Sequence, residues 1–177
     1  TDLLASLRQT RGVEVKAINW PHFGAMAFNH LHPPFDNPKL RRALLPAIDQ
    51  TAFIQAIVGD RTDLMRVPSG YYTEGTPMAN HAGLEVLTGP RDLGLARKLI
   101  ADSGYKGEPI RYLTSQQYDF HYRMALVMAD QLKKAGFAME MVVVDWATLI
   151  QRRGDPALWD LYITHSPFLP EPTLTPP

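Results

Sequence analysis

The sequence predicts an α/β domain, in which helices pack on the faces of a sheet. Helical and strand-like apolar patterns alternate in the second half of the chain, as α/β folds require. The helical segments also carry good start and stop residues. At 177 residues the chain is long enough for one hydrophobic core. We therefore expect a single lobe over residues 1–164.

The first elements are predicted from short periodic segments. Residues 2–9 carry leucines on one helical face, residues 13–18 mostly alternate as a half-buried strand does, and residues 25–29 form a second candidate strand. Asn37 is a good N-cap for a helix whose apolar face runs to residue 48, although Pro46 should bend it. Asp49 can then cap another short helix.

Residues 60–90 contain scattered glycine and proline and no sustained period, so they are predicted to be a long surface loop. Such loops are usually functional or pack on a neighbour. Tyr71, Tyr72 and Glu74 either tether this loop or contact a ligand.

The second half is more regular. Asp92 caps a helix that ends at Gly104, and a longer helix over residues 118–135 ends at Gly136. Strands are predicted at residues 110–114, 138–144 and 158–164, with a short helix capped by Asp145 before the last. The strand at 138–144 is so apolar that we expect it to be central and covered on both faces. Trp146 and Trp159 are expected to pack that short helix on the sheet, with ligand contact as the alternative. Residues 165–177, rich in proline, are predicted to be a linker leaving the lobe.

Composition excludes several functions. Lysine and arginine balance aspartate and glutamate at 18 each, so no charged field attracts nucleic acid. Cysteine is absent, which excludes thiolate chemistry. His30 and His32 have a metal-ligand spacing but no third ligand nearby, so we expect neither metal nor cofactor. His165 and Ser166 are adjacent on a strand and point to opposite faces, so they cannot form a nucleophile and base pair. We expect no enzymatic activity.

Ligands of open α/β sheets bind beyond the carboxyl ends of the strands. Two groups of side chains occupy such places. They are Ser115, Gln116 and Tyr118 after one predicted strand, and Thr164, His165, Ser166, Phe168 and Glu171 at the end of the last. The alternative interpretation of both groups is ordinary helix capping and linker chemistry.

Five segments in a fixed order carry a family resemblance. The longest of them, Pro33 to Asp49, has two prolines, a Phe-Asp pair, a helix rich in basic residues and then Ala-Ile-Asp. The segments are Phe28-Asn29, Pro33 to Asp49, Ser103-Gly104-Tyr105, Gln131 to Phe137 and Asp145 to Leu149. This pattern resembles the family 5 extracytoplasmic solute-binding proteins, the dipeptide, oligopeptide and nickel-binding subunits of ABC importers. The resemblance covers roughly residues 2–165.

The resemblance implies a type II periplasmic-binding-protein-like lobe with a mixed sheet, namely the C-terminal lobe of a two-lobed protein. It implies a monomeric receptor in the periplasm or at the cell surface, with its signal peptide upstream of this chain. Such a receptor binds a peptide or other small solute between its lobes and delivers it to membrane permease subunits. A single lobe should bind weakly or not at all.

The chain departs from the peptide binders at one place. Where they have a Gly-Trp segment and then an acid that pairs with the peptide's amino group, this chain has residues 165–168, with Glu171 as the only candidate acid. The departure puts a peptide ligand in question and leaves a binding role intact. The alternatives are a solute-sensing module of a transcriptional regulator and a small hydrolase.

Overall fold

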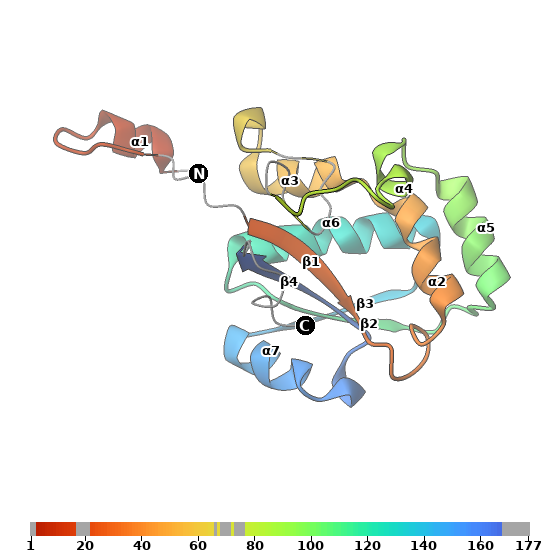
Figure 1. Ribbon diagram of the computed structural model, residues 1–177. Coiled ribbons are helices and arrows are strands. Elements are labelled where there is room, and N and C mark those ends of the chain that lie inside the picture. The colour runs from red at the N-terminus through yellow and green to blue at the C-terminus, as the bar shows by residue number, and fades with distance from the viewer. Residues whose placement is uncertain (1–2, 17–21, 66, 68–71, 73–76, 168–177) are drawn as a thin grey trace.

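The computed structural model describes residues 3–16, 22–65, 67, 72 and 77–167. Within them the chain forms a mixed sheet flanked by helices (Figure 1). The strands are β1 (His22–Phe28), β2 (Ile110–Ser115), β3 (Met139–Val144) and β4 (Leu161–Pro167). The α-helices are α1 (Leu4–Gln9), α2 (Pro38–Ala43), α3 (Gln50–Val58), α4 (Glu85–Thr88), α5 (Leu93–Ser103), α6 (Asp119–Ala135) and α7 (Trp146–Arg153). The short 3-10 helices are η1 (Leu45–Ala47), η2 (Thr62–Leu64) and η3 (Pro156–Leu158).

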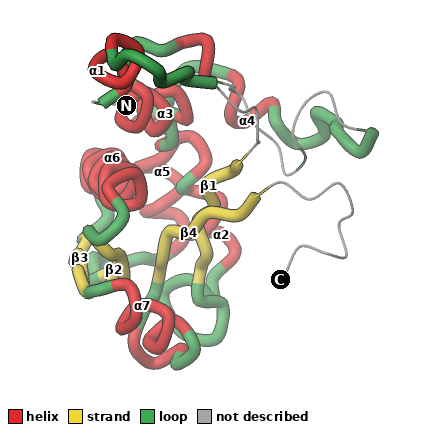
Figure 2. Tube along the Cα trace, turned by 90° about the vertical axis from the view of Figure 1, so that its left-hand side faces the viewer, coloured by secondary structure: helices red, strands yellow, loops and turns green. Residues whose placement is uncertain are grey.

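The strand order in the sheet is β1-β4-β2-β3. β2 runs parallel to both β3 and β4, whereas β1 is antiparallel to β4. Helix α6 covers one face and α7 covers the other (Figures 1 and 2). Because β2, β3 and β4 are parallel, their carboxyl ends lie at one edge of the sheet, which we call the carboxyl edge.

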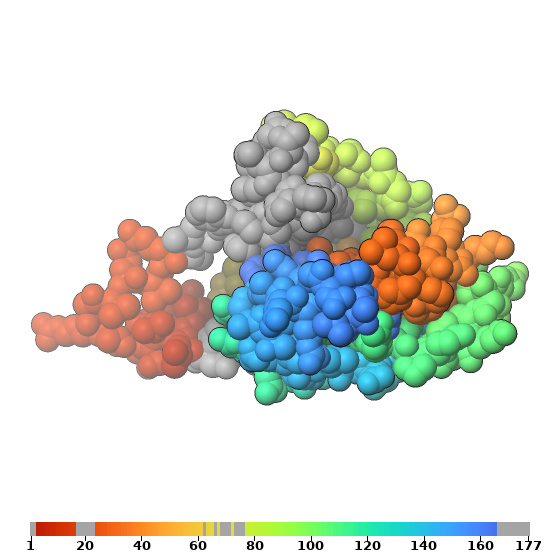
Figure 3. Space-filling view, turned by 90° about the horizontal axis from the view of Figure 1, so that it is seen from below, coloured from red at the N-terminus to blue at the C-terminus, as the bar shows by residue number. Residues whose placement is uncertain are grey.

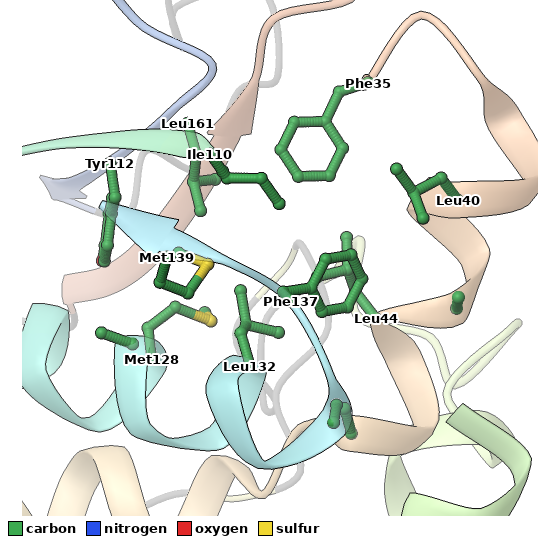
Figure 4. Close-up of a cluster of buried hydrophobic side chains, with 14 of the residues drawn as sticks. Phe35, Leu40, Leu44, Ile110, Tyr112, Met128, Leu132, Phe137, Met139 and Leu161 are labelled. Atoms are coloured by element: carbon green, nitrogen blue, oxygen red, sulfur yellow. The ribbon is translucent and has the colours of Figure 1, made fainter. Parts of the chain in front are cut away.

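Most of the hydrophobic core lies between the sheet, α6 and the helices α2 and α5 (Figure 4). Leu132 of α6 is completely buried there, as are Phe35 and Leu40 from the chain around the start of α2. A smaller core beneath α7 contains Leu113, Leu149 and Trp159. The sheet is therefore covered on both faces, as the predicted fold class requires.

Local signals place the helix boundaries. The side chain of Asn37 accepts a hydrogen bond from the Lys39 amide, as predicted for the N-cap. The predicted interruption at Pro46 is also confirmed, since α2 ends at Ala43 and the chain continues as η1. At the end of α6, Gly136 adopts a φ of 112°, a conformation that favours glycine.

Three predictions about strands are wrong. β3 lies at the edge of the sheet, not at its centre, and Val143 is 40% exposed. Residues 13–16 form no strand, and the last two residues of that predicted strand, 17 and 18, lie outside the described residues. The last strand begins three residues later than predicted, at Leu161, because η3 precedes it, and it continues to Pro167, beyond the predicted lobe boundary at residue 164. That residues 168–177 form a linker stays a prediction.

Candidate functional site

Two loops meet at the carboxyl edge. β2 ends at Ser115 and leads into α6, whereas β3 ends at Val144 and leads into α7. Gln117 joins the two loops, because its side-chain oxygen accepts a hydrogen bond from the backbone N–H of Trp146 at 3.1 Å. Asp145 begins α7 by accepting from the Thr148 amide at 2.9 Å. The starts of both helices are thus held in place at the same edge.

Five ring side chains from the starts of α6 and α7 and from β4 form one cluster, which we call the ring cluster. Its members are Tyr118, Phe120, His121, Trp146 and His165. The centroids of the Tyr118 and Trp146 rings lie 5.0 Å apart, with the rings edge to face. Phe120 and His165 lie 4.9 Å apart in a similar arrangement. Tyr118 is 41% exposed. The cluster therefore presents part of an aromatic surface to solvent.

Two histidines of the ring cluster are hydrogen bonded to each other. Nε2 of His121 lies 2.5 Å from Nδ1 of His165. One nitrogen of this pair must donate and the other accept, so the two rings cannot both be imidazolium ions. His121 is completely buried, and its Nδ1 atom has no hydrogen-bond partner among the described residues. Burial, and then the charge of His165, lower the pKa of His121 to about 4. His121 is therefore neutral at neutral pH.

The structure separates the predicted residues that follow β2. Tyr118, a member of the ring cluster, is exposed, and so is Gln116, two residues before it. Ser115, in contrast, is completely buried, and its hydroxyl accepts a hydrogen bond from the Gln117 amide at 3.3 Å. Ser115 shapes the turn that carries its neighbours.

The predicted residues of β4 do not all face the same way. His165 lies on the face of the sheet that α6 covers, whereas Thr164 points to the opposite face because neighbouring strand residues alternate. Ser166 continues β4 and pairs with Phe23 of β1 in the strand register. Phe168 and Glu171 lie outside the described residues, as do Tyr71 and Glu74 of the long loop.

Sequence reasoning did not place His121 in the site, and it placed Trp146 there only as an alternative. His121 is predicted only as part of the buried face of α6, and Trp146 is predicted to pack α7 on the sheet, with ligand contact as the alternative; Trp146 does pack against the core beneath α7. The ring centroids of His121 and Trp146 in fact lie 5.2 Å apart at the carboxyl edge. One signal was available for His121, since it is the only ionisable side chain on the buried face of α6, whose other members are apolar except for Gln131.

His30 and His32, where we predicted no metal site, lie in the segment of residues 29–36 before α2, which we call the arm. Both ring nitrogens of His32 lie within hydrogen-bond distance of backbone carbonyl oxygens. Within the part of the chain that the structure describes, no cluster of three or more metal-ligating side chains occurs. None of the described helices is long and apolar enough to cross a membrane.

A cavity of about 350 Å³ lies at the opposite end of the sheet, between the arm, the end of α5 and the start of β2. Arg111 and Asp160 in its wall bond to each other, and the Tyr105 hydroxyl donates to the Glu108 carbonyl oxygen. We favour the carboxyl edge as the ligand site, because these polar groups are already paired within the protein, whereas Tyr118 and Gln116 are exposed.

Comparison with known proteins shows which family this chain resembles in sequence. Residues 1–176 match the family model of bacterial extracellular solute-binding proteins, family 5 middle. A probable peptide ABC transporter periplasmic-binding protein of Sinorhizobium fredii is 27% identical over 169 residues, which are 92% of this chain and 32% of the relative. A probable deoxycholate-binding periplasmic protein of Escherichia coli is 28% identical over 75% of this chain and 26% of its own length. The chain thus spans about a third of the length of the first relative and about a quarter of the length of the second.

Solved structures show the same fold. A dipeptide-binding protein of Pseudoalteromonas in complex with Met-Leu superposes with a TM-score of 0.70 and is 27% identical, covering 98% of this chain and 34% of that protein. The substrate-binding protein CtaP of Listeria monocytogenes superposes with a TM-score of 0.72 at 22% identity, covering 82% of this chain and 30% of that one. With its sequence matched almost from end to end, this chain belongs to the bacterial extracellular solute-binding proteins of family 5.

Proposed function

We propose that this chain forms one wall of the ligand site of an extracytoplasmic receptor that supplies a small solute to an ABC importer. The observation that carries the proposal is the ring cluster, which lies where ligands of α/β sheets bind, at the carboxyl ends of parallel strands. Membership of a family of solute-binding proteins supports binding, as opposed to catalysis.

The chemistry of the carboxyl edge favours a ligand with both apolar and amide-like groups. Tyr118 offers an aromatic surface, and the exposed Gln116 offers amide donors and acceptors beside it. Asp119, the acid at the start of α6, is already paired with Arg123 at 2.7 Å. A short peptide fits these properties, and two relatives are described as peptide-binding or dipeptide-binding.

The proposed mechanism is closure of the receptor around the ligand. A ligand that contacts the ring cluster and the remainder of the protein together has a higher affinity for the closed form, and so shifts the population toward it. The closed receptor, a monomer in the periplasm or at the cell surface, then docks on the permease subunits. We expect the lobe alone to bind weakly, because it carries only part of the site.

Replacing Tyr118 with alanine should weaken ligand binding in the full-length protein. Loss of an aromatic contact at the centre of a site typically costs about 1 to 2 kcal/mol, so we expect the Kd to rise about tenfold. Isothermal titration with Met-Leu, with a longer peptide and with deoxycholate would first identify a probe that binds, since relatives bind peptides or are described as binding deoxycholate.

The matched control is Leu126→Ala. Leu126 is 45% exposed and lies in α6, about two turns beyond Tyr118 at the start of that helix. Its replacement should leave the Kd unchanged. An equal affinity of the wild-type protein and the Tyr118→Ala variant for every probe that binds would contradict the proposed site.

A further inference from the structure

The arm, residues 29–36, is joined to the segment that precedes β4. Figure 3 shows the two segments side by side, the arm in orange and the segment around η3 in blue. The backbone N–H of Asn29 donates to the Asp160 carbonyl oxygen at 2.9 Å. The remaining links between the two segments are made by the side chains of Asn29 and His32.

Hydrogen-bond geometry determines which way the Asn29 amide is oriented. Its nitrogen donates to the carbonyl oxygens of Pro156 at 2.7 Å and Trp159 at 2.9 Å. Its oxygen accepts from the Leu31 N–H at 3.1 Å. An amide nitrogen has two hydrogens, so both are used by these two carbonyls. Although Nε2 of His32 lies 2.9 Å from that nitrogen, no hydrogen remains for it.

With both Asn29 hydrogens used in this way, each ring nitrogen of His32 faces a carbonyl acceptor. Nε2 lies 2.7 Å from the Pro156 carbonyl oxygen, and Nδ1 lies 2.8 Å from the Pro33 carbonyl oxygen. Carbonyl oxygens only accept, and a neutral imidazole has only one N–H. An imidazolium ion satisfies both carbonyl oxygens, and it leaves Nε2 in a 2.9 Å contact with the Asn29 amide nitrogen, which is also a donor.

The charges around His32 are consistent with a bound proton. An oxygen of the Asp160 carboxylate lies 3.6 Å from Nδ1, and this carboxylate is itself paired with Arg111. Hydrogen bonds to the Pro33 and Pro156 carbonyls raise the pKa of His32, with a smaller contribution from Asp160. Partial burial and the positive charge of Arg111 act in the opposite direction.

We propose that His32 is a proton-dependent clamp that ties the arm to η3. As an imidazolium ion it donates to carbonyl oxygens of both segments at once. Loss of the Nε2 proton leaves the hydrogen bond to Pro33, which lies within the arm, and turns a lone pair toward the Pro156 carbonyl oxygen, so the link to η3 is removed. Pro33 and Asp160 on either side of this link also line the cavity at this end of the sheet, so release of the clamp loosens the cavity wall.

The direction of the pH dependence follows from the raised pKa. The contribution of the clamp is fully present below the ordinary histidine pKa of about 6.5, and it is lost as the pH rises through the higher value of the folded protein. The clamp thus holds at low pH and is released as the pH rises past the raised pKa of His32.

Amide hydrogen exchange of the full-length protein tests the clamp. Between about pH 6 and about pH 9, after correction for the intrinsic rate, we expect protection of the Leu31 and Asp36 amides to fall about fivefold, which corresponds to one lost hydrogen bond. His32→Gln should remove this dependence. The matched control, His30→Gln, replaces an exposed histidine of the same arm and should keep it.

Nitrogen NMR of the wild-type imidazole provides a second readout that does not depend on the folding of a variant. At about pH 6, both ring nitrogens of His32 should show protonated shifts. A neutral tautomer at that pH would overturn the proposal, as would an unchanged pH dependence of arm exchange in the His32→Gln variant.

Discussion

Replacing Asp160 with alanine is expected to lower the free energy of unfolding by about 2 to 3 kcal/mol, because it removes a buried carboxylate that accepts hydrogen bonds from a backbone N–H and from the guanidinium of Arg111, which is 35% exposed. The Asp160 side chain is only 4% exposed. One carboxylate oxygen accepts from the backbone N–H of Arg111 at 2.7 Å and from its Nε at 3.0 Å, and the other accepts from its terminal nitrogen at 2.7 Å. Urea unfolding of the wild-type and variant proteins measures the difference.

Asp130→Ala is the matched control, because Asp130 also pairs with a basic residue but on the surface. Its bond to Lys134 spans 2.7 Å between side chains that are 56% and 55% exposed. Exposed pairs of this kind contribute less than about 0.5 kcal/mol. If the two variants lost similar amounts of stability, the Arg111–Asp160 pair would not have the structural role assigned to it.

Acid should destabilise the protein through His121. The pKa of this buried imidazole is lowered to about 4, whereas that of an unfolded histidine is about 6.5. The unfolded state therefore binds the proton first as the pH falls, and stability is lost between these two values. Between about pH 7 and about pH 4 this single site accounts for a loss of about 3 kcal/mol.

His121→Phe tests this expectation, since phenylalanine keeps a ring against Trp146 but has no titrating nitrogen. Urea unfolding at both pH values should show that the variant loses about 3 kcal/mol less on acidification than the wild-type protein. His30→Gln should behave as the wild type. A wild-type loss equal to that of His121→Phe would mean that His121 takes up its proton as easily in the folded protein as in the unfolded chain.

The two histidines give opposite pH dependences. His121 contributes a loss of stability toward acid, whereas His32 contributes a loss toward alkali, because burial lowers the pKa of the first and carbonyl hydrogen bonds raise that of the second. For these two sites together, stability is highest between their transitions. The two histidines lie near opposite ends of one sheet, His121 in α6 at its carboxyl edge and His32 in the arm at the other end.

Local chemistry was predictable from the sequence. Asn37, Asp49, Asp92 and Asp145 each accept a hydrogen bond from the start of the helix that they were predicted to cap. These features depend on residues within one turn of each other, which the sequence shows directly.

Features that depend on distant segments were less predictable. The apolar run at residues 139–144 suggested a central strand, but strand order is determined by which segments pair, and β3 pairs only with β2 among the described strands. The hydrogen bond from His121 to His165 joins residues 44 positions apart. Neither histidine carries a sequence signal for the other, so the ring cluster appears only once the fold is known.

Hydrogen exchange by mass spectrometry on the full-length protein tests the central claim, that the ligand binds at the carboxyl edge. With and without a saturating ligand identified by titration, we expect new protection in peptides covering residues 115–121 and 145–148. Peptides covering residues 103–109, at the opposite cavity, should show no change. Protection at residues 103–109 with none at the carboxyl edge would contradict the proposed location of the binding site.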